Sequence, residues 1–328
     1  MITVMGATGN TGGAIVRQLA ADGIPVRGIG RSAHRLASLP AGVETWSVDL
    51  ADRPALADAL HGSTAAYVLL PTDPTVPDYS STHDGISASI VGALTDSGVP
   101  HVVALSSLGA DRPTGTGFVE CLHRHELRLR ELEGVSQVIL RSAYLYETLS
   151  IGIEETLAHE TLIEAIDPSA RVPMVAAGDV ATIAAAAPRG PAAPGVTIHE
   201  VTGPDELTMP KVTRLLGAAF GRPGPTYARP PDATLREILR GAGFSLDGAE
   251  LYLALGNAIS DGTLGRRGDV RHDLPPPERA SRTGPPGWPP ATPSRPDQPG
   301  LAGLPYPVGS RGLPPTEMLT WPIACNSW

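Results

Sequence analysis

The stretch Met5-Gly6-Ala7-Thr8-Gly9-Asn10-Thr11-Gly12-Gly13 carries glycine at every third position, 6, 9 and 12. It separates the apolar run Ile2–Met5, which predicts a β-strand, from Thr11–Ala21, whose apolar residues recur at helical spacing. In such a unit the first glycine permits a tight turn, the second lets a pyrophosphate approach the backbone, and the third lets the helix pack closely on the sheet. We therefore predict that residues 6–12 bind a dinucleotide, although this GxxGxxG spacing is not the commonest GxGxxG fingerprint.

An ordinary glycine-rich turn is the alternative for this stretch, and we expect Asn10 or Thr11 to cap the helix. Short β-type runs continue to alternate with helical segments up to residue 140. This alternation predicts an α/β fold: a doubly wound Rossmann domain whose parallel sheet is covered on both faces and binds ligands beyond the carboxyl ends of its strands. The further predicted strands are Val26–Ile29, Val43–Val48, Ala65–Leu70, Val102–Leu105 and Gln137–Leu140.

Three regions follow from this pattern. Residues 1–150 are the predicted dinucleotide-binding domain, and residues 151–265 a small C-terminal α/β cap lobe that also contributes a helix and a strand to the Rossmann domain. Of the 34 prolines in the 328 residues, 15 fall in residues 266–328, so we predict that this Pro-rich tail is disordered. A shifted reading frame is the alternative origin of the tail.

The charge and the cysteines exclude several classes of protein. The net charge is −9, and because the tail carries 7 Arg against 5 acidic residues, the remainder stands near −11. Such an acidic body gives no field for nucleic acid or an anionic membrane, so we expect neither as a direct partner. Two cysteines give no disulfide framework, and no apolar run reaches the roughly 18 residues of a membrane span; we predict a cytoplasmic protein.

The segment after the second strand indicates which dinucleotide binds. Arg31 follows this strand, where an arginine accepts the 2′-phosphate of NADP and an acidic residue would favour NAD. We therefore predict NADP(H), with NAD possible; the alternative is that Arg31 is a solvated loop charge. Asp49, followed by Leu50 after the third strand, either accepts from the adenine amino group or organises the next turn. Leu70, which ends the fourth strand, is a further predicted cofactor contact.

Several segments together resemble the NmrA-like family of atypical short-chain dehydrogenases/reductases. The resemblance implies a Rossmann domain with a small C-terminal substrate lobe and NAD(P)(H) binding. The family contains reductases of quinones, dyes and similar acceptors, and also cofactor-sensing regulators without turnover. The segments are Gly6–Gly12, Val26–Arg31, Val48–Leu50, Val102–Gly109, Val138–Arg141, Pro173–Val180 and Val201–Pro204, in the order the family has them.

The catalytic pair of ordinary short-chain reductases, a tyrosine with a lysine four residues later, is absent. None of the seven tyrosines has this partner, and the only lysine is Lys211. His123 lies eleven residues before Gly134, and by resemblance this position holds a lysine beside the nicotinamide ribose in some members. We therefore predict that His123 contacts the ribose and relays a proton, oriented by Glu120 or Glu126; a surface histidine is the alternative.

Two further residues are candidates at the expected nicotinamide end. Ser106 ends the fifth strand and either contacts the cofactor or a substrate carbonyl, or caps the strand. Tyr144 is a candidate aromatic wall of the substrate cleft or a core residue; Thr148 stands where the family usually has asparagine. Cys121 and His125 share a helix face, but without two further placed ligands we predict no metal site.

Two functions remain open on this evidence. The first is an NADPH-dependent reductase that transfers hydride to a small quinone-like or carbonyl acceptor without a tyrosine–lysine pair. The second is a non-catalytic sensor of the NADP redox state that acts on a regulatory protein partner. The absent pair favours the sensor, whereas His123 and the aromatic cleft residues favour the enzyme.

Overall fold

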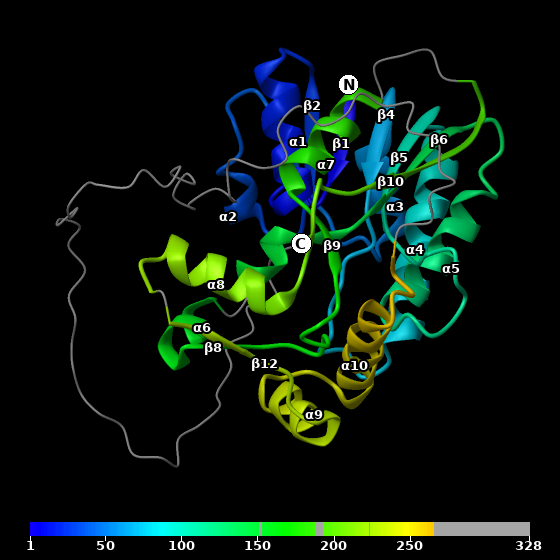
Figure 1. Cartoon of the computed structure of the whole chain (residues 1–328). Coiled ribbons are helices and arrows are strands. Elements are labelled where there is room, and N and C mark those ends of the chain that lie inside the picture. The colour runs from blue at the N-terminus through cyan, green and yellow to red at the C-terminus, as the bar shows by residue number, and fades with distance from the viewer. Residues whose placement is uncertain (151–152, 188–192, 223, 266–328) are drawn as a thin grey trace, which may run out of the picture.

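A seven-stranded parallel sheet organises the computed structural model, which describes residues 1–150, 153–187, 193–222 and 224–265 (Figure 1). All neighbouring strands of this sheet run parallel, and the order β10-β6-β5-β4-β1-β2-β3 reverses direction beside β1 and β4. The predicted doubly wound Rossmann fold is thereby confirmed. The strands are β1 Ile2–Met5, β2 Val26–Gly30, β3 Glu44–Ser47, β4 Ala65–Val68, β5 His101–Ser107, β6 Ser136–Ser142 and β10 Gly195–Val201.

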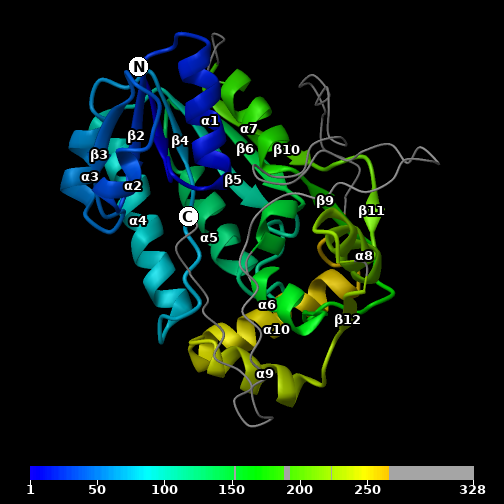
Figure 2. The same ribbon diagram turned by 90° about the vertical axis from the view of Figure 1, so that its left-hand side faces the viewer.

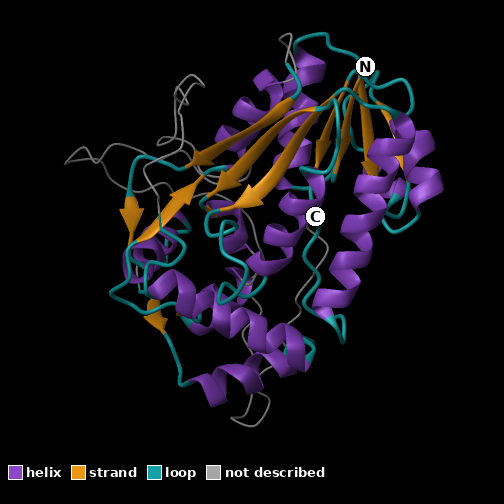
Figure 3. Ribbon diagram, turned by 90° about the vertical axis from the view of Figure 1, so that its right-hand side faces the viewer, coloured by secondary structure: helices purple, strands orange, loops and turns teal. Residues whose placement is uncertain are grey.

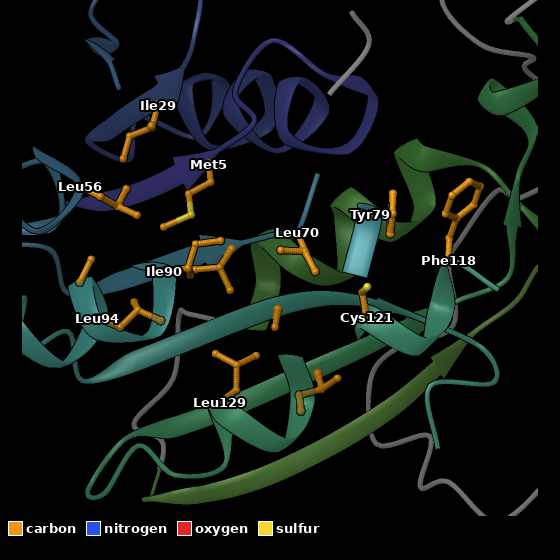
Figure 4. Close-up of a cluster of buried hydrophobic side chains, with 14 of the residues drawn as sticks. Met5, Ile29, Leu56, Leu70, Tyr79, Ile90, Leu94, Phe118, Cys121 and Leu129 are labelled. Atoms are coloured by element: carbon orange, nitrogen blue, oxygen red, sulfur yellow. The ribbon is translucent and has the colours of Figure 1, made fainter. Parts of the chain in front are cut away.

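Helices cover both faces of the sheet because side chains along each strand alternate between two cores. Val4 and Leu105 pack on α1 (Asn10–Ala21) and α7 (Ala177–Ala186). Met5 and Val68 point the other way, into the cluster of Figure 4, where Leu56, Ile90 and Leu129 belong to the opposite helices. Those helices are α3 Arg53–Leu60, α4 Tyr79–Ser97 and α5 Val119–Leu129, and the short α2 Ala33–Leu36 follows β2.

The chain returns to the sheet late. The region predicted as a cap lobe contributes β10 as the seventh strand, paired with β6, and α7 as a covering helix beside α1. The strand and the helix that sequence analysis expects this region to contribute to the Rossmann domain correspond to these two elements. The Rossmann sheet therefore has one strand more than the six that the first 140 residues predict.

The rest of the C-terminal region, together with the segment 144–150 after β6, forms a lobe past the carboxyl ends of the strands (Figures 2 and 3). Its strands have two to four residues, too few for a recognisable alternation, and sequence analysis missed them. They are β7 Tyr144–Leu145, β9 Val172–Val175 and β11 Glu206–Leu207 in one sheet, and β8 Thr161–Ile163 with β12 Thr226–Ala228 in another. The helices are α6 Ile153–His159, α8 Met209–Ala219, α9 Asp232–Gly241 and α10 Leu246–Ser260, with a 3₁₀ turn, η1, over Tyr146–Ser150.

Two sequence-based expectations concern features beyond this architecture. The predicted disorder of residues 266–328 lies outside the described residues. In the part of the chain that is described, every helix is too short or too polar to cross a membrane.

Candidate cofactor and acceptor site

The glycine turn leaves no room for side chains at two of its three glycines. Gly6 has φ +61°, in the left-handed region, and a Cβ there would lie 2.7 Å from Leu69 Cδ2. A Cβ on Gly12 would lie 2.3 Å from the Gly6 carbonyl oxygen. The Gly9 N–H closes the turn by donating to that same oxygen at 2.8 Å. The turn at Gly6 and the close packing at Gly12 therefore match their predicted roles.

The start of α1 carries no side-chain cap, which corrects the expectation for Asn10 and Thr11. Gly9 is the N-cap residue, and Asn10 is the first residue of the helix. The Thr11 hydroxyl instead accepts from the buried Tyr67 phenol at 3.0 Å. Because no side chain occupies the first-turn N–H groups, which follow the carboxyl end of β1, they fit a pyrophosphate.

The segment after β2 folds back on the glycine turn. Arg31 is exposed, and its carbonyl accepts from the Ser47 hydroxyl at 3.0 Å. The Arg35 guanidinium donates to the Thr8 carbonyl at 2.7 Å, so a second arginine lies against the turn. Asp49 accepts from the Ala51 N–H at 3.0 Å and thus organises the next turn; its adenine contact stays a prediction.

A cavity of about 340 Å³ lies past the carboxyl ends of β4, β5 and β6. Leu70, Ser106 and Tyr144, all predicted site residues, line it together with Thr148. The lobe closes it with apolar side chains from α9 and α10, among them Leu239 and Leu255. Figure 4 shows Tyr79 and Phe118, which also line the cavity, at one end of the core cluster. The structure thus brings the predicted nicotinamide end and the lobe together around one apolar space.

A buried ion pair fixes the strand ends at this edge. Arg141 of β6 donates to both oxygens of Glu126 of α5, at 2.9 and 2.6 Å, and the Glu126 side chain is only 2% exposed. Ser106 donates to the same carboxylate at 2.6 Å. The Ser106 hydroxyl proton is therefore used in the hydrogen bond with Glu126. The predicted contact of Ser106 with cofactor or substrate stays a prediction.

Val119 and Leu122 of α5 line the cavity, and His123, which follows Leu122, is not among the described residues that line it. The His123 Nδ1 atom lies 2.8 Å from the Ala110 carbonyl oxygen. The expected orienting residues are wrong, since Glu120 accepts from the Gly115 N–H and Glu126 holds Arg141. The catalytic and ribose-binding roles of His123 stay predictions.

Polar groups that sequence analysis missed lie in the lobe wall of the cavity. Within the described chain, the cavity lining contains one carboxylate, Glu164, and one cation, Arg171. The phenol of Tyr252 donates to Glu164 Oε2. Burial raises the pKa of Glu164 to about 7, although its hydrogen bonds with Tyr252 and the Ala165 backbone oppose the shift. No local motif marks these residues, because 88 positions separate Glu164 from Tyr252.

Comparisons with known proteins agree with this geometry. The model of the NAD(P)H-binding family matches residues 6–187, from the glycine turn through α7. The chain belongs to this NAD(P)H-binding family. The NmrA-like resemblance and the NAD(P)-binding Rossmann prediction are thereby confirmed.

Two curated relatives of this NAD(P)H-binding protein are reductases by name. The (4-alkanoyl-5-oxo-2,5-dihydrofuran-3-yl)methyl phosphate reductase of Streptomyces griseus is 32% identical over 231 residues, 68% of this chain and 75% of the relative. The NAD(P)H azoreductase of Xenophilus azovorans is 28% identical over 224 residues, again 68% of this chain and 75% of the relative.

Solved structures share the fold. An NADPH-dependent quinone oxidoreductase from Escherichia coli, complexed with NADPH, has a TM-score of 0.67 and 22% identity over 82% of this chain and 92% of that one. The Citrobacter sp. triphenylmethane reductase complexed with NADP(H) also has a TM-score of 0.67, with 20% identity over 82% of this chain and 93% of that one.

Proposed function

We propose that the protein is an NADPH-dependent reductase of a small conjugated acceptor with a largely apolar body, such as a quinone or an unsaturated carbonyl compound. The observation that carries the proposal is the apolar cavity of about 340 Å³ past β4, β5 and β6, on the sheet edge that also holds the glycine turn. A parallel sheet presents its ligands at this edge. The names of the two reductase relatives support the same reaction class.

NADPH, when bound, supplies a hydride, and the chain's own residues position the acceptor and exclude water. The residues 6–12 and the uncapped start of α1 would hold the pyrophosphate. Arg31, exposed beside the turn, would pair with the 2′-phosphate, and Arg35 bonds Thr8 and keeps this segment in place. The lobe residues Leu239 and Leu255 would bury the acceptor.

The cation at the cavity edge bears on the acceptor's chemistry. The Arg171 side chain is 69% exposed, and its ion pair with Glu206 is long, at 3.8 Å. Such an arginine is available to a phosphate or carboxylate group at the cavity mouth. The Streptomyces griseus relative is named for a substrate with an alkanoyl chain and a phosphate. An acceptor that combines an apolar chain with an anionic group therefore belongs in the test panel.

NADPH oxidation by the purified protein against quinones, azo dyes and phosphorylated alkanoyl butenolides tests the proposal. We expect turnover with at least one of these classes, and Arg171→Ala to weaken only the acceptors that carry an anionic group. Tight NADPH binding without turnover on any acceptor would overturn the reductase proposal and leave the cofactor-sensing function.

A further inference from the structure

The carboxyl group of Glu164 lies in the cavity wall and has no cationic partner among the residues that the structure describes. Glu164 follows β8 and is the only carboxylate among the described residues that line the cavity. The pKa of this carboxyl group is set by its burial and by its hydrogen bonds with the Tyr252 phenol and the Ala165 backbone. The nearby Arg229 bonds the Ala165 carbonyl at 3.1 Å but directs its charge to Asp232, at 2.9 Å. A carboxyl group in this setting is not held as an anion.

Three phenols from three elements surround this carboxyl group. Tyr252 of α10 donates to it, whereas Tyr227 of β12 lies close but donates to the Ile166 carbonyl and does not line the cavity. Tyr144 of β7 lines the cavity and lies within electrostatic range of Glu164, and its phenol makes no hydrogen bond with any residue that the structure describes. Burial raises the pKa of all three phenols, so they remain protonated donors.

The position of Tyr144 connects this cluster with the sheet edge. β6 ends at Ser142, and β7 begins two residues later with Tyr144. The cavity is therefore continuous from Ser142 at the nicotinamide end, past Tyr144, to Glu164 and Tyr252 in the lobe. Hydroxyl groups such as those of Ser107 and Ser142 line the sheet edge of the cavity, whereas Glu164 is the only carboxyl group among the described residues of its wall.

We propose that Glu164 is the proton donor of this site and that the acceptor is a carbonyl compound whose oxygen lies between the Glu164 carboxyl group and the Tyr144 phenol. This inference rests on the proposed reductase function. As hydride from NADPH bonds to the carbonyl carbon, or to a carbon conjugated with it, the π electrons of the carbonyl move to its oxygen. The oxygen takes the Glu164 proton, and NADPH becomes NADP⁺. The resulting carboxylate regains a proton from water. Tyr252 is a positioning residue, because its phenol donates to the Glu164 carboxyl group and acts on the acceptor only through it.

The variants Glu164→Gln and Tyr252→Phe test the proposal, with Tyr227→Phe as the matched control. Tyr227 is a neighbouring phenol that stays out of the cavity. With menadione as acceptor, we expect Glu164→Gln to lower kcat on the order of 100-fold, the lower range for loss of a general acid. NADPH affinity should stay unchanged, and Glu164→Asp should restore part of the rate. The control variant should behave as wild type.

The pH profile separates proton donation from a structural effect. Because the pKa of Glu164 is raised to about 7, the wild-type kcat/KM should fall as the pH rises through about 7, when the carboxyl group loses its proton. Glu164→Gln should lose this dependence, and Tyr252→Phe should move it upward, because the phenol stabilises the carboxylate. A Glu164→Gln variant with wild-type kcat and an unchanged profile would overturn the proposal.

A second readout does not require turnover. An infrared titration of wild type minus Glu164→Gln follows the protonated carboxyl band with and without menadione, in the NADP⁺-loaded protein. We expect a Glu164 band that persists to near-neutral pH and shifts when menadione binds. If no acceptor is reduced but the band shifts, the reductase function fails while Glu164 stays a ligand-binding group; a band that menadione does not move would contradict the role of Glu164 itself.

Discussion

The cofactor end and the acceptor end of this sheet edge are built by different means. The cofactor end depends on close backbone packing over a few consecutive residues. A Cβ on Gly12, for example, would lie only 2.3 Å from the Gly6 carbonyl oxygen. The acceptor end depends on side chains such as Tyr144, Glu164 and Tyr252, which three elements of the lobe bring together. Changes at the first end should therefore cost folding and cofactor binding together, whereas changes at the second should affect the acceptor alone.

The largest expected effect comes from the buried ion pair of Glu126 and Arg141, to which the cavity residue Ser106 is bonded. Replacing Glu126 by Gln leaves Arg141 buried without its charge partner and should destabilise the fold by about 3–5 kcal/mol. Asp96→Asn, in an exposed ion pair with Arg53, is the control and should cost less than about 1 kcal/mol. Urea unfolding measures both, and equal losses would contradict the buried pair's importance.

Gly12→Ala tests the claim that backbone space specifies the cofactor end. A methyl group against the Gly6 carbonyl forces α1 away from the turn, at a cost of about 1–3 kcal/mol by analogy with overpacked cores. NADPH affinity, measured by calorimetry, should fall with it. Gly85→Ala is the control: Gly85 lies in α4 with open space around it, so alanine should be neutral or stabilising there.

Arg31→Ala tests the cofactor end through the difference between NADPH and NADH binding. If the exposed Arg31 guanidinium binds the 2′-phosphate, its loss should weaken NADPH binding about tenfold to a hundredfold, the range of a hydrogen bond to a charged group. NADH, which lacks this phosphate, should bind as before. An equal loss for the two cofactors, measured by fluorescence titration, would refute the phosphate assignment.

Stability at the acceptor end should depend on pH. Folding raises the Glu164 pKa from 4.5 to about 7, so the folded state holds the proton more tightly and loses stability as the pH rises between these values. Relative to Glu164→Gln, the wild type should thus be less stable above pH 7 than below pH 4.5. Chemical denaturation at the two extremes measures the difference, and a pH-independent difference would show that Glu164 titrates normally.

The two ends also differ in what could be predicted from the sequence. The glycine turn and the parallel sheet follow from local patterns, because each depends on neighbours in the chain. The phosphate contact of Arg31 stays a prediction. The helix cap was the exception: Asn10 and Thr11 are good capping types, but the turn places Gly9 at that position. Local preference yields there to the geometry of the turn.

The acceptor end could be predicted only in part: Leu70, Ser106 and Tyr144 line the cavity as expected, but its other contacts are long-range. The family resemblance predicted His123, but its Nδ1 atom lies 2.8 Å from the Ala110 carbonyl oxygen, and Val119 and Leu122 are the described residues of α5 that line the cavity. Glu126 was expected to orient His123, but its carboxylate pairs with Arg141. No local pattern indicates that Arg141, fifteen residues later, lies beside it. The lobe strands, at two to four residues, carry too little pattern to align Tyr144 with Glu164.

The central claim is that the lobe cavity receives the acceptor while the glycine turn holds NADPH. Ile238 of α9 lines the cavity, whereas its neighbour Glu237 is exposed. The decisive measurement is NADPH oxidation by Ile238→Trp, with Glu237→Trp as the control, alongside NADPH affinity for both variants. We predict that Ile238→Trp binds NADPH as wild type does and loses acceptor reduction, while Glu237→Trp retains both. Full turnover by a normally folded Ile238→Trp variant would contradict the account.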